Sequence, residues 1–180
     1  MRELSLHILD IVENSVKANA TLIQVDIEVK NGYLYITVVD NGKGMSEEFL
    51  AKVVDPFTTT RTTRKVGLGI PLIKQAAEVA EGEFSITSKL GEGTTVKTSY
   101  KLDSIDRVPL GDVPETITTL LYPDIEFVWR YAVNGEEFIF DTREVKEELQ
   151  GVPIDSPEIL VFLKSLLKEN IDSINGGIII

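Results

Sequence analysis

Residues 33–45 read Tyr-Leu-Tyr-Ile-Thr-Val-Val-Asp-Asn-Gly-Lys-Gly-Met, an alternating apolar run that ends in an acid and two glycines. The alternation predicts a β-strand at 33–40 with one buried face, because successive side chains of a strand point to opposite sides. Asn31-Gly32 precedes it and predicts a tight hairpin with a strand at 22–29. Asp40 then ends the strand, where a carboxylate can stabilise a turn or accept a hydrogen bond from an exocyclic amine.

Helical and strand-like patterns on either side of this hairpin indicate an α+β protein. A Thr- and Arg-rich loop is expected at 55–66, and Gly82 is expected to take the left-handed cap that ends the following helix. The other expected helices are 3–19, a short one from Ser46, 68–80, 114–121, one from Thr142 that stops at Gly151, and 157–170; the other expected strands are 84–89, 94–102, 126–133 and 136–141.

Charge and composition narrow the possible partners and the compartment. The 180 residues carry a net charge of −11, which disfavours nucleic acid and anionic lipid surfaces. The absence of cysteine excludes disulfides and thiolate metal sites. No run of about eighteen apolar residues occurs, so we expect no membrane span and a cytoplasmic protein whose ligands are small molecules or proteins.

The composition also changes along the chain, which predicts two α+β units. Residues 1–102 hold 12 basic and 13 acidic residues, a net of −1, whereas residues 103–180 hold 6 and 16, a net of −10. The role of the acidic second unit is open, and its charge favours a basic protein partner. Its hairpin, with the only Trp, is expected to form core, and the apolar residues 176–180 to form either a docked strand or a dimer contact.

A polar stripe marks the first expected helix. Glu3, His7, Asp10, Asn14 and Lys17 fall within a wedge of about 80°, since helix positions three or four apart share a face. Such a stripe is usually a solvated face, but a carboxylate, an amide and an ammonium in line also suit a Mg²⁺-polyphosphate ligand. The single histidine in this stripe is expected to pack within the fold.

Two further glycine pairs occur downstream. Gly67-Leu68-Gly69 is expected to open a helix, where free N–H groups favour phosphate, and Gly91-Glu92-Gly93-Thr94 connects two expected strands. Each pair alone is weak evidence, because glycines are common in turns.

The order of these segments is more specific than any one of them, and it resembles the Bergerat nucleotide site of the GHKL superfamily, which includes gyrase, MutL, the histidine kinases and the anti-sigma-factor kinases. Residues 12–18 (Val-Glu-Asn-Ser-Val-Lys-Ala) are similar to the N box and Asp40 to Gly44 to the first glycine box. The F box and the other two glycine boxes correspond to the segment around Phe57, to Gly67–Ile70 and to Gly91–Thr94. The resemblance covers residues 1–102. It implies a two-layer α/β sandwich, with a mixed sheet covered by helices, and the change in composition adds a small C-terminal α+β unit to it.

The resemblance also implies roles and cofactors, namely ATP and Mg²⁺. Asn14, together with Asp10, would ligate Mg²⁺, and Asp40 would read adenine. Gly42, Gly44 and Met45 would shape the base pocket, Gly67 and Gly69 would bind phosphate through their N–H groups, and Lys17 would contact phosphate. Phe57, Thr60, Leu68 and Thr94 lie within the matching boxes. Arg61, Arg64 and Lys65 would clamp the γ-phosphate from a lid, or are ordinary loop charges.

The chain departs from the family pattern at two positions. The general-base position four residues before Asn14 holds Asp10, whose shorter side chain predicts slow hydrolysis, and Glu13 is a poorer candidate because it lies off the stripe. Lys65-Val66 replaces the usual Gly-Thr before the second glycine box. We expect no phosphoacceptor-His domain. The hypotheses are therefore a Mg-ATP protein that phosphorylates a His, Ser or Thr of a partner in trans, a slow ATPase switch, or a non-catalytic adenine-nucleotide sensor. Whether the chain is an enzyme, and whether it forms an oligomer, stays open.

Overall fold

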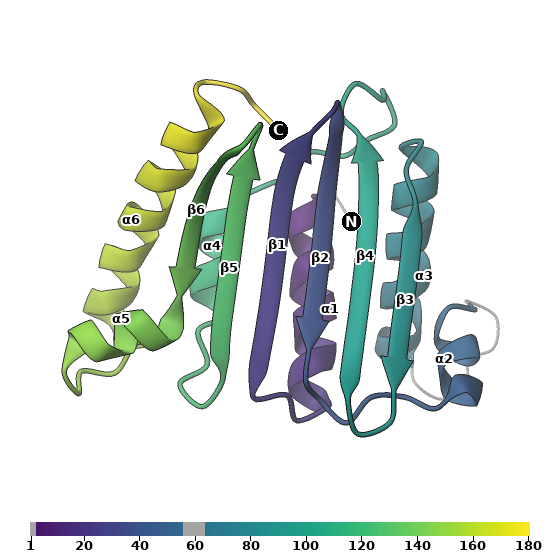
Figure 1. Cartoon of the computed structure of the whole chain (residues 1–180), viewed down its shortest axis with the longest axis horizontal. Helices are drawn as coiled ribbons and strands as arrows, with labels where there is room; N and C mark the ends of the chain where they lie inside the picture. The colour runs from purple at the N-terminus through teal and green to yellow at the C-terminus, as the bar shows by residue number, and fades with distance from the viewer. Residues whose placement is uncertain (1–2, 56–63) are drawn as a thin grey trace.

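The computed structural model describes residues 3–55 and 64–180, with side chains from residue 69 onward in the second range. It shows one six-stranded mixed sheet in the order β3-β4-β2-β1-β5-β6, with helices packed on one face (Figure 1). The strands are β1 (Leu22–Lys30), β2 (Tyr33–Asp40), β3 (Phe84–Lys89), β4 (Gly93–Lys101), β5 (Glu126–Val133) and β6 (Glu136–Asp141). The helices are α1 (Leu4–Lys17), α2 (Glu47–Val53), α3 (Arg64–Val79), α4 (Val113–Thr119), α5 (Thr142–Leu149) and α6 (Pro157–Asn175). The predicted α+β class and two-layer arrangement are confirmed.

Both predicted hairpins form at their Asn-Gly dipeptides. Asn31 and Gly32 have φ values of 52° and 79°, and Asn134 and Gly135 have 50° and 94°. Two successive positive φ angles give the turn whose twist matches that of the flanking strands. The register of β1 and β2 follows, with Lys30 opposite Tyr33 and Ile23 opposite Asp40.

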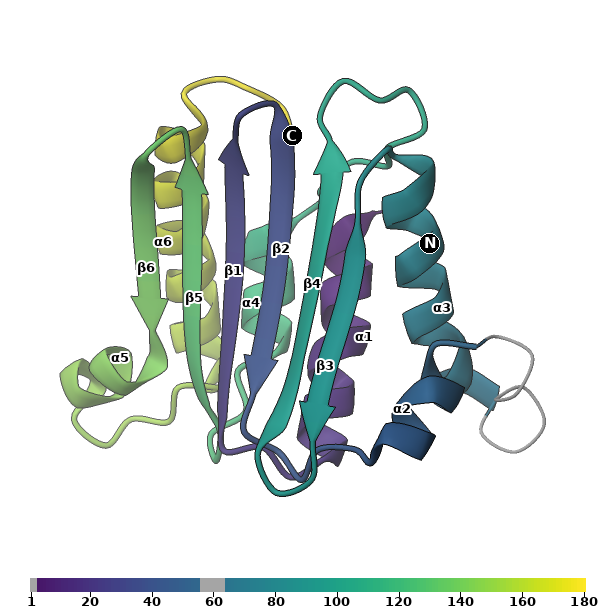
Figure 2. The same ribbon diagram turned by 45° about the vertical axis from the view of Figure 1, so that its right-hand side comes forward.

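The second half of the chain extends the same sheet. β5 runs parallel to β1, and β6 then pairs antiparallel with β5. The proposed boundary at residue 102 therefore falls after β4, within one continuous sheet. Helices α1, α3, α4 and α6 lie on one side of this sheet, as two views of the molecule show (Figures 1 and 2). The core lies between the layers and includes Trp129, 3% exposed, in the hairpin where core was expected.

Two helix boundaries differ from the prediction by more than two residues. α3 begins at Arg64, inside the stretch expected to be a loop, and continues through Pro71. α6 continues past Asn170 to Asn175, because Ile171 is buried and Ile174 packs against the core. Gly176, with φ 58°, then takes the left-handed position that ends α6.

The expected role of Gly82 is wrong. The left-handed residue after α3 is Glu81, with φ 59°, and Gly82 has no positive φ. Gly82 is needed for another reason, since a Cβ there would lie 1.7 Å from the carbonyl oxygen of Ser99 on β4. The close approach of two backbones selects glycine here.

The N-terminus of α1 is capped by the segment that follows β4. No side chain caps this helix, and the N–H groups of Leu4 and Ser5 donate to the carbonyls of Pro109 (2.9 Å) and Leu110 (2.8 Å). Leu110 in turn donates to the carbonyl of Ile180 (3.1 Å), so the terminal residues dock there without forming a strand. The second half of the chain thus helps to hold the helix that carries the polar stripe.

His7 is expected to make the fold sensitive to acid. Its side chain is buried, and its Nδ1 has no hydrogen-bond partner among the described residues. Burial, aided by the N-terminal charge, lowers the pKa of His7 from 6.5 to about 4. The folded state holds His7 in its neutral form. The contribution of His7 to the free energy of unfolding is therefore fully present above the pKa that His7 has in the unfolded chain, and it is lost as the pH falls from 6.5 towards about 4.

The measurement is thermal unfolding between about pH 7 and about pH 5 for wild type and His7→Leu. The wild-type midpoint should fall more than that of the variant, which keeps every other titrating group. Equal shifts in the two proteins would contradict this assignment.

Candidate functional site

A cavity of about 190 Å³ opens where α1 meets the end of β2 and the start of β4. Its walls are mostly apolar, with a few converging polar groups, which is typical of small-molecule sites. It gathers six of the predicted site residues: Asn14, Lys17, Asp40, Gly44, Met45 and Thr94. The other lining residues are Ile11, Ser15, Ala18, Val38, Lys43, Phe49, Val53, Ile70, Ile86 and Val96.

Asp40 is the buried acid of this cavity, with 8% of its surface exposed. The Ser15 hydroxyl of α1 donates to Oδ2 of Asp40 at 2.6 Å, and the Gly42 N–H donates to Oδ1 at 2.8 Å. These two donors fix the orientation of the carboxylate. A carboxylate has about four acceptor positions, so Asp40 keeps acceptor capacity for a ligand in the cavity.

Three glycines let the backbone segments around Asp40 approach each other. A Cβ on Gly42 would lie 2.8 Å from the Ala18 carbonyl oxygen, and one on Gly44, whose φ is 70°, would lie 2.0 Å from that of Lys89. Gly93 has φ 118°, and a Cβ there would lie 2.0 Å from the Asp40 carbonyl oxygen. The glycine motifs are therefore required by close packing as well as by backbone conformation.

Ser88 on β3 ties the first and third glycine boxes together. Its hydroxyl accepts from the Met45 N–H (2.8 Å), donates to the Gly93 carbonyl (2.9 Å) and lies 2.8 Å from the Thr94 hydroxyl. Since Ser88 has a single proton, donation to Gly93 makes Thr94 the donor to Ser88. The lone pairs of Thr94 then remain for a ligand, beside Asp40, its register partner on β2.

Only part of the polar stripe of α1 lines the cavity. Asn14 and Lys17 line the cavity, and Asp10 faces α3, where a Cβ on Gly69 would lie 3.8 Å from its Oδ2. Burial raises the pKa of Asp10, and the charge of Glu13 adds to this, which moves Asp10 towards the range of a general base. Glu13 itself is exposed and does not line the cavity.

The lid residues can be placed only in part. Phe57, Thr60 and Arg61 lie outside the described residues. Arg64, Lys65, Gly67 and Leu68 belong to the backbone of α3. Because α3 begins at Arg64, Gly69 is its sixth residue rather than its opening residue, and the helical N–H groups without a partner inside α3 are those of residues 64–66. Gly67 and Gly69 therefore lie inside α3 rather than at its opening, and their contact with phosphate stays a prediction.

Several functional residues were missed from the sequence. Ser15 was hidden in the N box, although a hydroxyl on the apolar side of an amphipathic helix is a usable signal. Ser88 lies in an alternating strand and gave no signal. Phe49 lines the cavity from α2 with 55% of its surface exposed, and only the position of α2 reveals it.

The fold and the site define an α+β domain in which a helix and two strand ends enclose a cavity of small-molecule size. The family model described as "Histidine kinase-, DNA gyrase B-, and HSP90-like ATPase" matches residues 2–104. The chain belongs to this family. Residues 2–104 are thus an ATP-binding domain of the kinase-like type, which confirms the GHKL resemblance.

Curated relatives match over the same part of the chain. Histidine protein kinase DivJ of Caulobacter vibrioides is 35% identical over 101 residues, which are 53% of this chain and 17% of that protein. Sensor histidine kinase YkoH of Bacillus subtilis is 30% identical over 95 residues, which are 50% of this chain and 21% of that protein. The chain thus spans about a fifth of the length of these relatives.

A solved structure supports the fold. The crystal structure of the N-terminal domain of a DNA repair protein superposes with a TM-score of 0.52 at 16% identity, over 77% of this chain and 52% of that one. This likeness concerns the fold alone.

Within residues 3–55 and 64–180, every helix is too short or too polar to cross a membrane.

Proposed function

We propose that the protein binds Mg-ATP in the α1–β2–β4 cavity and transfers the γ-phosphoryl group to a partner protein in trans, or hydrolyses ATP slowly as a switch. The observation that carries this proposal is the convergence of Asp40, Thr94, Asn14 and Lys17 on one cavity. Two acceptors lie beside its apolar floor, and an amide and an ammonium lie along α1. This is the order of groups that a base followed by a polyphosphate requires.

Asp40 suits the base end of the ligand. Its free lone pairs can accept from an exocyclic amine, while Ile86, Val96 and Met45 supply apolar contacts for a planar ring. A base with a carbonyl at that position would place an acceptor against a carboxylate, so adenine is preferred.

The residues present fit a magnesium ion. Asn14 and Asp10 lie one turn apart on α1 and supply an amide oxygen and a carboxylate. Mg²⁺ takes hard oxygen ligands, usually one or two protein oxygens together with phosphate oxygens and waters. When bound, the ion would neutralise phosphate charge, and Lys17 would add a second cation for the same phosphates.

Asp10→Asn is expected to slow ATP hydrolysis by about 100-fold, because a positioned general base contributes at least about that factor. Glu13→Gln is the matched control, since it makes the same change of charge one turn further on, at an exposed position. The readouts are phosphate release under single turnover and ATP affinity by calorimetry. Equal rates for the two variants would remove Asp10 from this role.

The fate of the phosphoryl group is decided by radiolabelled ATP, given to the protein alone and with cell extract. Label in an extract protein would support transfer in trans, and slow phosphate release alone would support the switch. Unchanged ATP in both, with nucleotide binding intact, would support a non-catalytic sensor.

We propose a basic protein as the partner, because the acidic excess of residues 103–180 is displayed on exposed side chains of two helices. They include Glu144, Glu147 and Glu148 on α5 and Glu158 and Glu169 on α6. A surface of one charge accelerates and orients association with a partner whose surface has the opposite charge. A pull-down with and without a Mg-ATP analogue, repeated at high salt, tests both the charge and the nucleotide dependence.

A further inference from the structure

Strand β6 forms one edge of the sheet, and no described element pairs with its outer side (Figures 1 and 2). An edge strand presents unpaired backbone N–H and C=O groups, which serve as a template for another chain unless a proline, a bulge or a repelling charge prevents pairing. Residues 136–141 contain no proline, and their register with β5 is continuous, without a bulge. The backbone of this edge can therefore accept a further strand.

The hairpin at Asn134-Gly135 determines which backbone groups of β6 point outward. In a two-residue hairpin the residues that flank the turn form a hydrogen-bonded pair, and here these are Val133 and Glu136. Alternation along an antiparallel pair then directs the N–H and C=O groups of Glu137 and Ile139 away from β5. No turn, loop or cap elsewhere in the described residues supplies a backbone partner for them. Two donors and two acceptors are thus available at this edge.

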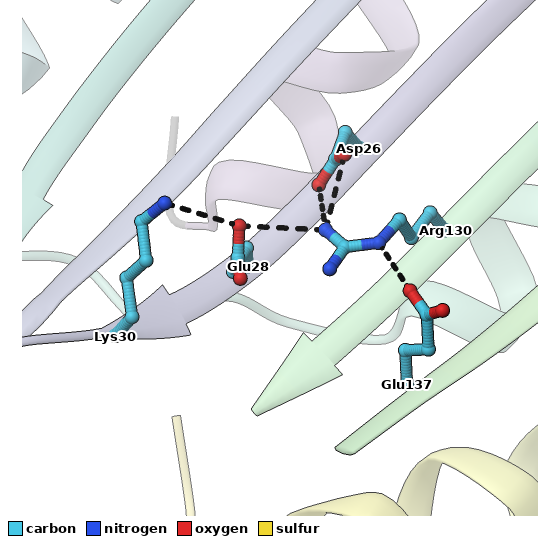
Figure 3. Close-up of polar contacts among 5 residues, drawn as sticks. All are labelled: Asp26, Glu28, Lys30, Arg130 and Glu137. Carbon is cyan, nitrogen blue, oxygen red and sulfur yellow. Dashed lines mark hydrogen bonds and ion pairs between the residues drawn. The ribbon is translucent and has the colours of Figure 1, made fainter. Parts of the chain in front are cut away.

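The edge strand is fixed on both faces of the sheet. On the open face, Nε of Arg130 lies 2.6 Å from Glu137 on β6, and Nη1 of the same side chain lies 3.1 Å from Asp26 on β1 (Figure 3). On the helix side, Phe140 is buried in the core. The edge therefore already has the conformation that a further strand requires, so pairing has to order only the incoming chain.

An apolar flank of α6 lies beside this edge. The buried Leu163 faces the sheet, and the next residue, Lys164, pairs with Glu115 on α4, which lies on the inner side of α6 (Figure 1). Since successive helix residues are about 100° apart, Phe162 lies on the other flank of α6, away from α4 and towards the edge. Phe162 is 61% exposed, and Leu166, one turn further on, is partly buried. A strand added to β6 would cover this apolar surface.

The charge around the edge is strongly negative. Residues 136–149, which form β6 and α5, hold six acidic and two basic residues, a net of −4. Both basic side chains already have carboxylate partners, because Arg143 pairs with Asp141 and Lys146 with Glu126. A second copy of β6 laid along the first would bring carboxylates together, which is destabilising. The charge therefore favours a basic occupant and disfavours another copy of this chain.

We infer that β6 binds an extended basic segment of a partner protein as an additional strand, antiparallel to β6. The inference rests on the basic partner proposed above and specifies how that partner is held. Basic side chains of the segment lie on the open face beside Glu137, and the alternate apolar side chains cover Phe162 on the helix side. Backbone hydrogen bonds to Glu137 and Ile139 contribute affinity, and the alternation of the side chains gives specificity.

Fluorescence anisotropy with a labelled synthetic peptide tests the inference. The probe is an acetylated and amidated peptide of alternating lysine and valine, about eight residues long. Two further versions carry N-methyl groups on every lysine or on every valine. Antiparallel pairing directs the lysine N–H groups towards β6, so methylation of the lysines should weaken binding at least about tenfold more than methylation of the valines. Equal binding of the two versions, or the reverse order, would overturn the inference.

Variants of the protein locate the site. Ile139→Pro removes an outward N–H and leaves the hydrogen bonds to β5 in place, whereas Phe162→Ser removes the apolar contact. Each should weaken binding of the unmethylated peptide at least about tenfold. Val161→Ser is the matched control, because Val161 is 71% exposed and lies about 200° around the helix from Leu163, facing away from the sheet. It should bind the peptide as the wild type does.

Thermal unfolding of each variant separates lost binding from lost folding. Normal peptide binding by both Ile139→Pro and Phe162→Ser would overturn the inference. A doubled mass in light scattering that Ile139→Pro abolishes would assign the edge to a second copy of the chain, and would overturn it as well.

Failure of strand addition can be distinguished from failure of the proposed function. Strands β1 and β5 separate β6 from β2 and the nucleotide cavity, so the affinity for Mg-ATP should be the same in all these variants. In the pull-down described above, a basic protein captured equally by wild type and Ile139→Pro would keep the proposed partner and overturn its binding as a strand.

Discussion

Asp40→Asn is expected to lower ATP affinity by about 100-fold while leaving the fold intact. The amide oxygen can still accept from the Gly42 N–H, and the amide nitrogen can donate to Ser15. Ser15 then donates to the Ile11 carbonyl, which already lies 3.3 Å away. The second amide proton points into the cavity, where a ligand amine would meet a donor instead of an acceptor.

The magnitude follows from the charged hydrogen bond that is lost. Such a bond contributes about 1.5–3 kcal/mol, and opposed donors add to the loss, so about 3 kcal/mol corresponds to about 100-fold. Isothermal titration with Mg-ATP and ADP measures it. Asp103→Asn makes the same change of charge at a side chain that is 85% exposed and should bind normally. Affinities within about threefold for Asp40→Asn and wild type would contradict the proposed adenine site.

Gly93→Ala is expected to cost about 3 kcal/mol of unfolding free energy, because left-handed strain of about 1–2 kcal/mol and overpacking of about 1–3 kcal/mol add. The new Cβ would lie 2.0 Å from the Asp40 carbonyl oxygen, at a residue with φ 118°. Residue 93 and the Asp40 carbonyl both belong to the backbone, so the clash is removed only if the end of β2 and the start of β4 separate. The midpoint of thermal unfolding should therefore fall by about 10 °C for a chain of this size.

Gly91→Ala is the matched control in the same connection. Gly91 also has a positive φ, 80°, but no atom lies within 4 Å of a Cβ placed there. Only the conformational strain remains, about 1 kcal/mol, which corresponds to a few degrees. Circular dichroism on both variants gives the comparison. If Gly93→Ala were as stable as Gly91→Ala, the close approach of the Asp40 carbonyl would not be what requires glycine at position 93.

The predicted site residues differ in how far the structure brings them together. Asn14, Lys17, Asp40 and Thr94 meet at one cavity, and each was predictable because it lies in a helix or at a strand end whose pattern was clear. Gly44 lies in the connection that follows β2. The lid was less accessible to prediction. Glycine and proline in residues 64–71 weaken helix propensity, and tertiary packing of α3 outweighed it.

The sequence by itself determined the helices, the hairpins and the ordered motifs, because hydrophobic periodicity and turn chemistry act between near neighbours. Only the tertiary structure decided that β5 joins β1 in parallel, that Ser15 and Ser88 hold Asp40 and Thr94, and that Gly82 is selected by Ser99. These contacts link residues that are far apart in the chain. The energies of these contacts depend on distances that are set by the packing of the two layers. No pattern between near neighbours in the sequence predicts those distances.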